Sequence, residues 1–175
     1  MKNNKKWIQY IILILFVVIA GVTLFSGVLS TDEVPEVGKL APDFSLKGLN
    51  GQVYQLSDFK GKPVVVNFWG SFCEPCVREM PAIEDIYNKY QTEDLMVLGI
   101  NLAEPEVTVQ SFVNQVGVTF PILLDKNIVS DQYDVKYYPT TFFVDVNGII
   151  MEKKIGEMSE SYLIQTVNKL TAEKE

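Results

Sequence analysis

The sequence contains no histidine, and only two of its 175 residues are cysteines. Two cysteines without histidine cannot complete the closed four-ligand nitrogen and sulfur site of a structural zinc ion within one chain. Any acid–base chemistry must also fall to carboxylates, thiols, lysine or tyrosine. We therefore expect no metal site, and the two cysteines become the first candidates for chemistry.

Charged residues are missing from one long stretch near the start. Residues 7–31 contain no aspartate, glutamate, lysine or arginine, and residues 8–25 are dominated by isoleucine, leucine, valine and phenylalanine. About 20 apolar residues span a bilayer core. Three lysines precede the stretch and acidic residues follow it, and positive flanks stay in the cytoplasm. The sequence predicts a cytoplasmic N-terminus (1–6), a transmembrane signal-anchor (7–29), a tether (30–36) and an extracytoplasmic domain (37–175).

The alternative for this segment is a cleaved signal peptide. A cleaved signal has a shorter apolar core and a small-x-small site, of which Val28-Leu29-Ser30 is a poor version. No cysteine lies near residue 30 to carry a lipid anchor. We therefore expect a single-pass protein that keeps its anchor in the cell membrane.

The part of the chain after residue 31 is acidic. It holds all 22 acidic residues and 12 of the 15 basic ones, a net charge of −10. A domain of this charge is a poor candidate for binding nucleic acid. We expect no nucleic-acid partner.

Both cysteines lie in the motif Cys73-Glu74-Pro75-Cys76, directly after the apolar run Val64–Trp69. A buried strand that ends in Cys-x-x-Cys at the start of a helix is a redox arrangement. The helix N-terminus favours the thiolate of the first cysteine, and the second follows one turn later. A bond that closes so short a loop contributes little to folding. The motif therefore predicts a redox-active disulfide that works without a cofactor.

Strand and helix patterns alternate through the rest of the chain. Asn-Gly turn signals at 50–51 and 147–148 mark two hairpins, and Pro81 should kink its helix. Strands are expected at 41–46, 53–56, 64–69, 95–101, 120–124, 140–145 and 149–153. Helices are expected at 74–90, 104–116, 128–133 and 159–171, the last one capped by Ser159. This order predicts an α/β fold in which helices flank a central mixed sheet, with an additional N-terminal β-hairpin.

Several motifs together resemble those of one family, the membrane-anchored ResA/TlpA-type thiol–disulfide oxidoreductases. The resemblance covers about residues 37–169 and implies a thioredoxin-like fold. Cys-Glu-Pro-Cys followed by Glu79 is its more specific part and resembles ResA. The other matching segments are Ala41-Pro42-Asp43-Phe44, Leu56-Ser57-Asp58, Asn67-Phe68-Trp69-Gly70 and Tyr138-Pro139-Thr140-Thr141-Phe142.

The resemblance implies roles for four residues. Cys73 would be the exposed, attacking cysteine and Cys76 the resolving one. Glu79 would be the active-site carboxylate, since thioredoxins proper carry an aspartate at the position of Asn67. Pro139 would be a cis-proline that faces the site and offers backbone groups to an extended substrate.

The surround of this site is expected to include six further residues. Glu74 places a negative charge beside Cys73, which opposes thiolate formation and makes the couple more reducing. Phe72 stands where many relatives have tryptophan, and it keeps the apolar cover without the indole N–H. The others are Pro75, Trp69, Tyr138 and Glu104.

The resemblance implies a disulfide reductant outside the cytoplasmic membrane, re-reduced by a membrane electron donor of the CcdA type. Its implied substrate is the haem-attachment motif of apocytochrome c. An alternative is another exterior protein, such as a sporulation or cell-wall enzyme. A thiol peroxidase is disfavoured because the proline and threonine pattern before a peroxidatic cysteine is missing. A copper chaperone is disfavoured because such carriers of this fold use Cys-x-x-x-Cys with a distant histidine.

Overall fold

The computed structural model describes residues 7, 9–18, 34–90, 92 and 94–172. The chain divides into two units, Met1–Glu33 and Val34–Glu175. Residues 7 and 9–18 of the first unit are helical. Residues 1–6, residues 8 and 19–29 of the predicted span 7–29, and the tether up to residue 33 lie outside the described residues. Among the helices of the described part, none has the length and hydropathy needed to cross a membrane.

A five-stranded mixed sheet forms the centre of the second unit, in the order β5-β4-β3-β6-β7. β3 lies in the middle, parallel to β4 on one side and antiparallel to β6 on the other. The predicted mixed sheet is thus confirmed. Its strands are β3 (Val64–Trp69), β4 (Met96–Leu102), β5 (Ile122–Asp125), β6 (Thr140–Val144) and β7 (Ile150–Ile155).

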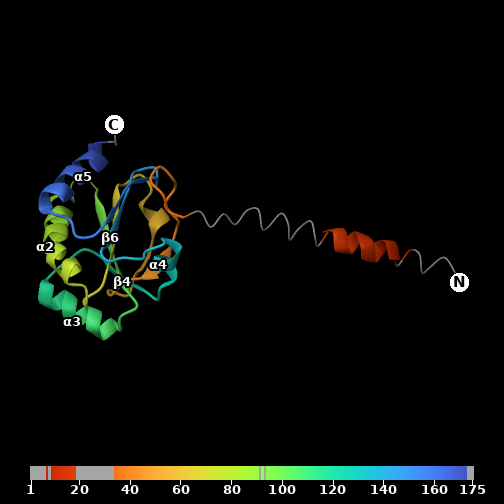
Figure 1. Cartoon of the computed structure of the whole chain (residues 1–175), viewed down its shortest axis with the longest axis horizontal. Coiled ribbons are helices and arrows are strands. Elements are labelled where there is room, and N and C mark those ends of the chain that lie inside the picture. Colours follow the sequence, from red (N-terminus) through yellow and green to blue (C-terminus); the bar gives the residue numbers. More distant parts are fainter. Residues whose placement is uncertain (1–6, 8, 19–33, 91, 93, 173–175) are drawn as a thin grey trace. The chain divides into compact units, whose positions relative to one another are not determined.

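Helices and a hairpin cover the two faces of this sheet (Figure 1). Every residue of β3 is buried, which explains its continuous apolar run, because a strand covered on both sides has no polar face. One face packs against α2 (Glu74–Lys89), α3 (Glu106–Val116) and α5 (Glu160–Ala172). The other packs against α4 (Ile128–Gln132) and the 3-10 helix η1 (Leu56–Phe59).

Two helices on the first face carry the signals that the sequence predicts. α2 is continuous from Glu74 to Lys89 and passes through Pro81. The hydroxyl of Ser159 accepts the backbone N–H of Tyr162 at 3.3 Å, so Ser159 caps α5 as expected. α2 and α5 pack side by side on the sheet, which places the start of α2 next to the loop that leads into α5.

Several predicted boundaries are wrong by a few residues, and three of them have a clear physical reason. The strand expected at 41–46 is only Ser45–Lys47 (β1), which pairs antiparallel with Val53–Gln55 (β2). Pro42 has no N–H to pair, and the Asp43 carboxylate accepts the N–H of Ser57 instead. The strand expected at 120–124 begins after Pro121.

The third boundary is the start of α3, which lies at Glu106 and not at residue 104. Ala103 has a φ of 52°, in the left-handed region. The Glu104 side chain is bound elsewhere, as described below. Pro105 has a ψ of 135°, which is not helical, and the residue before a proline is disfavoured in the helical conformation. The helix therefore begins after Pro105 and not at Glu104.

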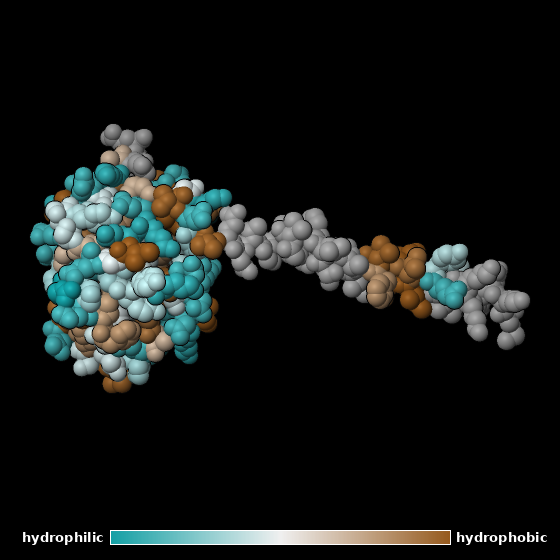
Figure 2. Space-filling view, in the orientation of Figure 1, coloured by the Kyte–Doolittle hydropathy of each residue, from teal (hydrophilic) through white to brown (hydrophobic). Residues whose placement is uncertain are grey.

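The visible surface of the second unit is mostly hydrophilic, with small separate hydrophobic patches (Figure 2). This agrees with the excess of acidic residues after residue 31. Specific contacts by single side chains therefore matter more on this face than one broad apolar patch.

Candidate active site

Cys73 and Cys76 form a disulfide at the start of α2, as predicted, with their Cα atoms 5.2 Å apart. Cys73 is the N-cap of the helix, and its sulfur accepts the N–H of Cys76 at 3.3 Å. This N–H is one of the four that a helix leaves unpaired at its N-terminus. The same contact would stabilise a Cys73 thiolate after reduction.

The two cysteines differ in their access to solvent, and Cys73 is more buried than expected. Cys76 is fully buried and Cys73 retains 9% exposure. The expectation of an exposed Cys73 is therefore corrected for the disulfide form, since Cys73 belongs to the core cluster that also contains Trp69 and Met80. Of the two cysteines, Cys73 is the one that keeps some exposed surface.

Glu79 lies one turn after Cys76 on the buried side of α2, with 2% exposure. One carboxylate oxygen accepts the Asn67 side-chain amide at 2.9 Å. The other accepts the backbone N–H of Met158 at 3.0 Å. Asn67 is itself held by a hydrogen bond to the Thr141 hydroxyl in β6. The carboxyl is thus fixed by β3 and by the loop before α5, with neutral partners.

Burial raises the pKa of Glu79 to about 7, against the lowering effect of the hydrogen bonds from Met158 and Asn67, and the charge of Glu157 raises it further. The dominant cause is desolvation, which disfavours the charged form. A carboxyl with a pKa near neutrality can both accept and release a proton under ordinary conditions. Glu79 is therefore not the solvated surface carboxylate that its position on a helix could suggest.

The peptide bond between Tyr138 and Pro139 is cis, as the resemblance implied. Pro139 is buried, and its carbonyl accepts the N–H of Gly156 at 2.8 Å. Gly156 has a φ of 89°, a conformation that favours glycine. The cis-proline loop is thereby fastened to the end of β7.

Phe72 and Tyr138 form an aromatic pair beside the disulfide. Their rings meet edge to face, with centroids 6.3 Å apart. Phe72 is 66% exposed and Tyr138 37% exposed. Because Phe72 precedes Cys73 and Tyr138 precedes Pro139 in the sequence, these rings form an exposed apolar surface that joins the two loops.

The Glu104 side chain does lie next to the cysteine motif, where its carboxylate accepts hydrogen bonds from the protein itself. Its carboxylate accepts the N–H and hydroxyl of Ser71, and the side-chain amide of Asn101. Partial burial alone would raise the pKa of Glu104, but these hydrogen bonds hold it below its ordinary value. Glu104 thus ties the loop before Cys73 to the end of β4.

Three other predicted surround residues lie at the end of β3 and in the first turn of α2. Trp69 is fully buried, with its ring centroid 5.2 Å from that of Phe112, and it belongs to the core cluster that also contains Cys73. Pro75 occupies the first turn of α2, where its missing N–H is not needed. The carboxylate of Glu74 pairs with Arg78 at 2.8 Å, which balances part of the charge expected to act on Cys73.

Sequence reasoning missed the residues that hold Glu79 and the loop before α5. Met158 contributes only a backbone N–H, which no side-chain pattern reveals. Arg78 and Glu157 are 79 residues apart in the chain and read separately as ordinary surface charges. The one available signal was that Arg78, a basic residue, follows the cysteine motif at a helix start whose other charged residues are acidic.

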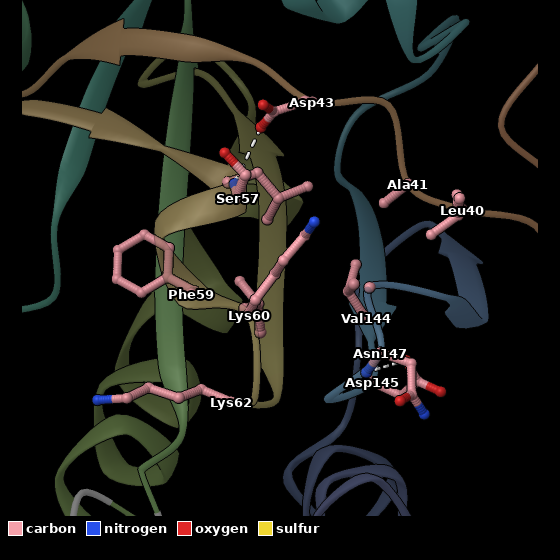
Figure 3. A pocket seen from close by; sticks show the side chains of 13 residues that line it. Leu40, Ala41, Asp43, Ser57, Phe59, Lys60, Lys62, Val144, Asp145 and Asn147 are labelled. Carbon is pink, nitrogen blue, oxygen red and sulfur yellow. Dashed lines mark hydrogen bonds between the residues drawn. The ribbon is translucent and has the colours of Figure 1, made fainter.

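A separate cavity of about 220 Å³ lies at the far end of the sheet (Figure 3). It is lined by Val64 at the first residue of β3 and by Val144 at the last residue of β6. The cysteines follow the opposite end of β3. This cavity therefore lies away from the disulfide, and Lys60 and Asp43 on its wall take no part in the site.

Comparisons with known proteins agree with this geometry. Residues 37–153 match the AhpC/TSA family. The thiol–disulfide oxidoreductase ResA of Bacillus anthracis is 36% identical over 172 residues, which cover 98% of this chain and 99% of the relative.

Two solved structures are similar as well. A protein assigned as the thiol:disulfide interchange protein DsbE from Chlorobium tepidum superposes with a TM-score of 0.74 at 32% identity, covering 78% of this chain and 98% of that one. StoA from Bacillus subtilis gives 0.65 at 27% identity, covering 74% and 98%.

Replacing Glu79 by glutamine should change how stability depends on pH. The folded-state pKa of about 7 lies above the ordinary 4.5, so the stability that the protonated carboxyl provides is complete below pH 4.5 and is lost as the pH rises through 7. The free energy of unfolding of the wild type should fall by about 3 kcal/mol more than that of Glu79→Gln between pH 4 and pH 8. Urea unfolding of the oxidised full-length protein measures this difference. Parallel curves for the two proteins would contradict it.

Removing the Glu104 carboxylate should loosen the loop before Cys73. Glu104→Ala loses charge-assisted hydrogen bonds to Ser71 and Asn101, so we expect a loss of roughly 2 kcal/mol in the free energy of unfolding. The matched control is Glu106→Ala, two residues further on, which removes only an exposed contact to Lys47 at 3.9 Å and should cost less than about 0.5 kcal/mol. Equal losses in the two variants would show that Glu104 does not hold this loop.

Proposed function

The chain belongs to the AhpC/TSA family and is a thiol–disulfide oxidoreductase of the ResA type, and from that premise we propose that it reduces disulfides of proteins outside the cytoplasmic membrane. The observation that carries the proposal is the Cys73–Cys76 disulfide at a helix N-terminus, with the buried Glu79 carboxyl one turn away. This arrangement holds an attacking sulfur, a resolving sulfur and a proton acceptor on one helix.

The reaction starts from the reduced pair. The Cys73 thiolate attacks one sulfur of a substrate disulfide, and the substrate's second sulfur leaves as a thiolate that takes up a proton. A mixed disulfide now joins Cys73 to the substrate. The Cys76 sulfur then attacks Cys73, the mixed disulfide breaks, and the substrate leaves with both sulfurs reduced. Two electrons pass to the substrate, and the Cys73–Cys76 disulfide remains.

Glu79 supports the second step. Cys76 is fully buried, so its proton has to leave through a neighbouring group before the sulfur can attack. Burial raises the pKa of Glu79 to about 7, which lets the carboxylate accept this proton near neutral pH. Asn67 cannot take this role, because an amide carries no titrating proton.

The surface around Cys73 suits a peptide in an extended conformation. The backbone beside the cis Tyr138–Pro139 bond offers hydrogen-bonding groups to such a peptide. Phe72 and Tyr138 add an apolar, aromatic contact at the same place. We propose that Phe72, Tyr138 and Pro139 orient the substrate, while Glu74, Pro75, Trp69 and Glu104 support the loop and the helix start.

The substrate that we propose is the haem-attachment Cys-x-x-Cys-His motif of apocytochrome c. Haem attachment needs free thiols, and disulfides form readily outside the cytoplasm. A reductant is therefore needed on that side of the membrane. We propose that an N-terminal anchor over residues 7–29 holds the protein there, and that a membrane electron donor of the CcdA type returns the Cys73–Cys76 disulfide to the dithiol.

A resolving-cysteine variant should trap the substrate. In Cys76→Ala, the mixed disulfide on Cys73 cannot be released, so the protein should accumulate as a covalent adduct that a reducing agent dissolves. Mass spectrometry of the adduct identifies the partner. Cys73→Ala is the control and should trap at least tenfold less. Equal trapping by both variants would contradict the proposed reaction. Consumption of peroxide by the reduced wild-type protein, with no partner trapped by Cys76→Ala, would contradict it as well.

Deleting the gene should remove c-type cytochromes from the cell that carries it. We expect haem-stained cytochrome bands to disappear, to return with the full-length chain, and to stay absent with Cys73→Ala. A small dithiol in the medium should restore the bands, because it supplies the missing thiols directly. Normal bands in the deletion strain would exclude apocytochrome c as the required substrate and would direct the search to another exterior protein.

A further inference from the structure

Three consecutive residues between β7 and α5 bind three different parts of the active site. Gly156 donates its N–H to the carbonyl of Pro139 at 2.8 Å. Met158 donates its N–H to the carboxylate of Glu79 at 3.0 Å. Between them, the exposed side chain of Glu157 accepts hydrogen bonds from Arg78. We call residues 156–158 the clasp segment.

The contact between Arg78 and Glu157 has the geometry of a strong ion pair. The Arg78 Nε lies 3.1 Å from both carboxylate oxygens, and Nη2 lies 2.6 Å from one of them. Such forked contacts fix orientation as well as distance. The side chains are 50% and 39% exposed, so the pair adds little to global stability. Its local effect is to hold the clasp segment against α2.

Arg78 directly precedes Glu79 on α2, so the two side chains leave the helix about 100° apart, and both reach the clasp segment. The groups that act on Glu79 come from two segments outside α2: the amide of Asn67 in β3, which is bound to Thr141, and the N–H of Met158 in the clasp segment. On α2 itself, Cys76 lies one turn back. The charged group among its influences is Glu157. Arg78 in turn holds the pKa of Glu157 below its ordinary value.

We propose that Arg78 and Glu157 are positioning residues for Glu79. Their ion pair, which we call the clamp, holds the clasp segment so that the Met158 N–H stays on the Glu79 carboxylate. Arg78 also balances the negative charge that Glu157 places near this carboxylate. Arg78 therefore acts in two ways. It keeps a hydrogen bond that favours the ionised carboxylate, and it offsets a negative charge that disfavours it. Any effect of the clamp on catalysis rests on the proton-acceptor role proposed above for Glu79. The clamp as a structural contact does not depend on that role.

The two partners should have opposite effects when each is neutralised. In Arg78→Gln, Glu157 keeps an unbalanced negative charge and the clasp segment is released, so Glu79 should ionise at a higher pH. In Glu157→Gln, the charge is gone while the side-chain oxygen can still accept a hydrogen bond from Arg78. Glu79 should then ionise at a lower pH. Each shift should be about half a pH unit, the size expected of a partly exposed charge.

The experiment follows the side-chain carboxyl carbon of Glu79 by NMR as a function of pH, in the full-length oxidised protein, where the disulfide-bonded cysteines do not titrate. The signal is assigned by its loss in Glu79→Gln. Glu74→Gln is the matched control, because it removes the other carboxylate partner of Arg78 without touching the clasp segment. Glu74→Gln should leave the midpoint within about 0.2 pH units of the wild type, below the size expected for the clamp.

A second readout tests the clamp without any titration. Hydrogen exchange of the Met158 amide should be at least threefold faster in Arg78→Gln and unchanged in Glu74→Gln. Opposite midpoint shifts together with faster exchange support the proposal. Midpoints that stay fixed, that move in the same direction in both variants, or that move equally in Glu74→Gln would overturn it. Unchanged Met158 exchange in Arg78→Gln would likewise overturn it.

The pH dependence of substrate release separates this proposal from the catalytic one. If Glu79 accepts the Cys76 proton, the rate of mixed-disulfide resolution should follow the shifted midpoints in both variants. Shifted midpoints with an unchanged rate profile would contradict the role of Glu79 in the reaction and leave the clamp intact. If the Glu79 midpoint is unshifted in both variants, while the rate profile of the wild type follows its own Glu79 midpoint, the clamp alone would be contradicted.

Discussion

The desolvation of the Glu79 carboxyl is the constraint on which the rest of the site depends. A carboxylate in the core is costly unless hydrogen bonds or opposite charge compensate it. Here the compensation comes from two N–H donors, one on Asn67 and one on Met158, which leave the pKa near 7. A salt bridge in the same place would hold the group ionised with a low pKa, which would not suit the proton-acceptor role that we propose for it.

This requirement explains the arrangement of the surrounding elements. β3 is buried throughout and brings Asn67 beneath α2, while its last residue leads into the loop that starts the helix. The same helix N-terminus that holds Glu79 directs an N–H to the Cys73 sulfur. Glu104 fixes the loop before Cys73, and the clasp segment fixes both Pro139 and Glu79. The loop before the cysteines, the cis-proline loop and the buried carboxyl are thus each held by contacts that come from distant parts of the chain.

The sequence predicts the local parts of this structure well and the long-range parts poorly. The strand at Val64–Trp69, the helix that opens on the cysteines and the hairpin at Asn147-Gly148 follow from short apolar patterns and turn residues. The resemblance to a family was needed for the cis bond before Pro139, which no local pattern requires. The boundaries near Asp43 and Glu104 failed because each carboxylate accepts a backbone N–H from another part of the chain. The Asp43 carboxylate binds Ser57, and the Glu104 carboxylate binds Ser71.

The burial of Cys73 also escaped prediction, whereas Trp69 ends the strand that was expected to be buried. Cys73 belongs to the same core cluster as Trp69, whose ring packs on Phe112. Arg78 and Glu157 show the same limit, since their meeting depends on how α2 and the clasp segment pack together. Contacts of this kind follow from the tertiary fold, so single-chain patterns reveal the reactive pair more readily than its support.

The reduction potential of the Cys73–Cys76 couple is the most direct test of the claim that this disulfide works as a reductant. Full-length protein is equilibrated with dithiol buffers of graded potential, and the free thiols are then counted after alkylation. A single two-electron transition at about −270 mV, the value of a reducing thioredoxin, is expected. A transition at about −120 mV, as in a strong oxidant, or a disulfide that stays closed until the protein unfolds, would contradict the claim.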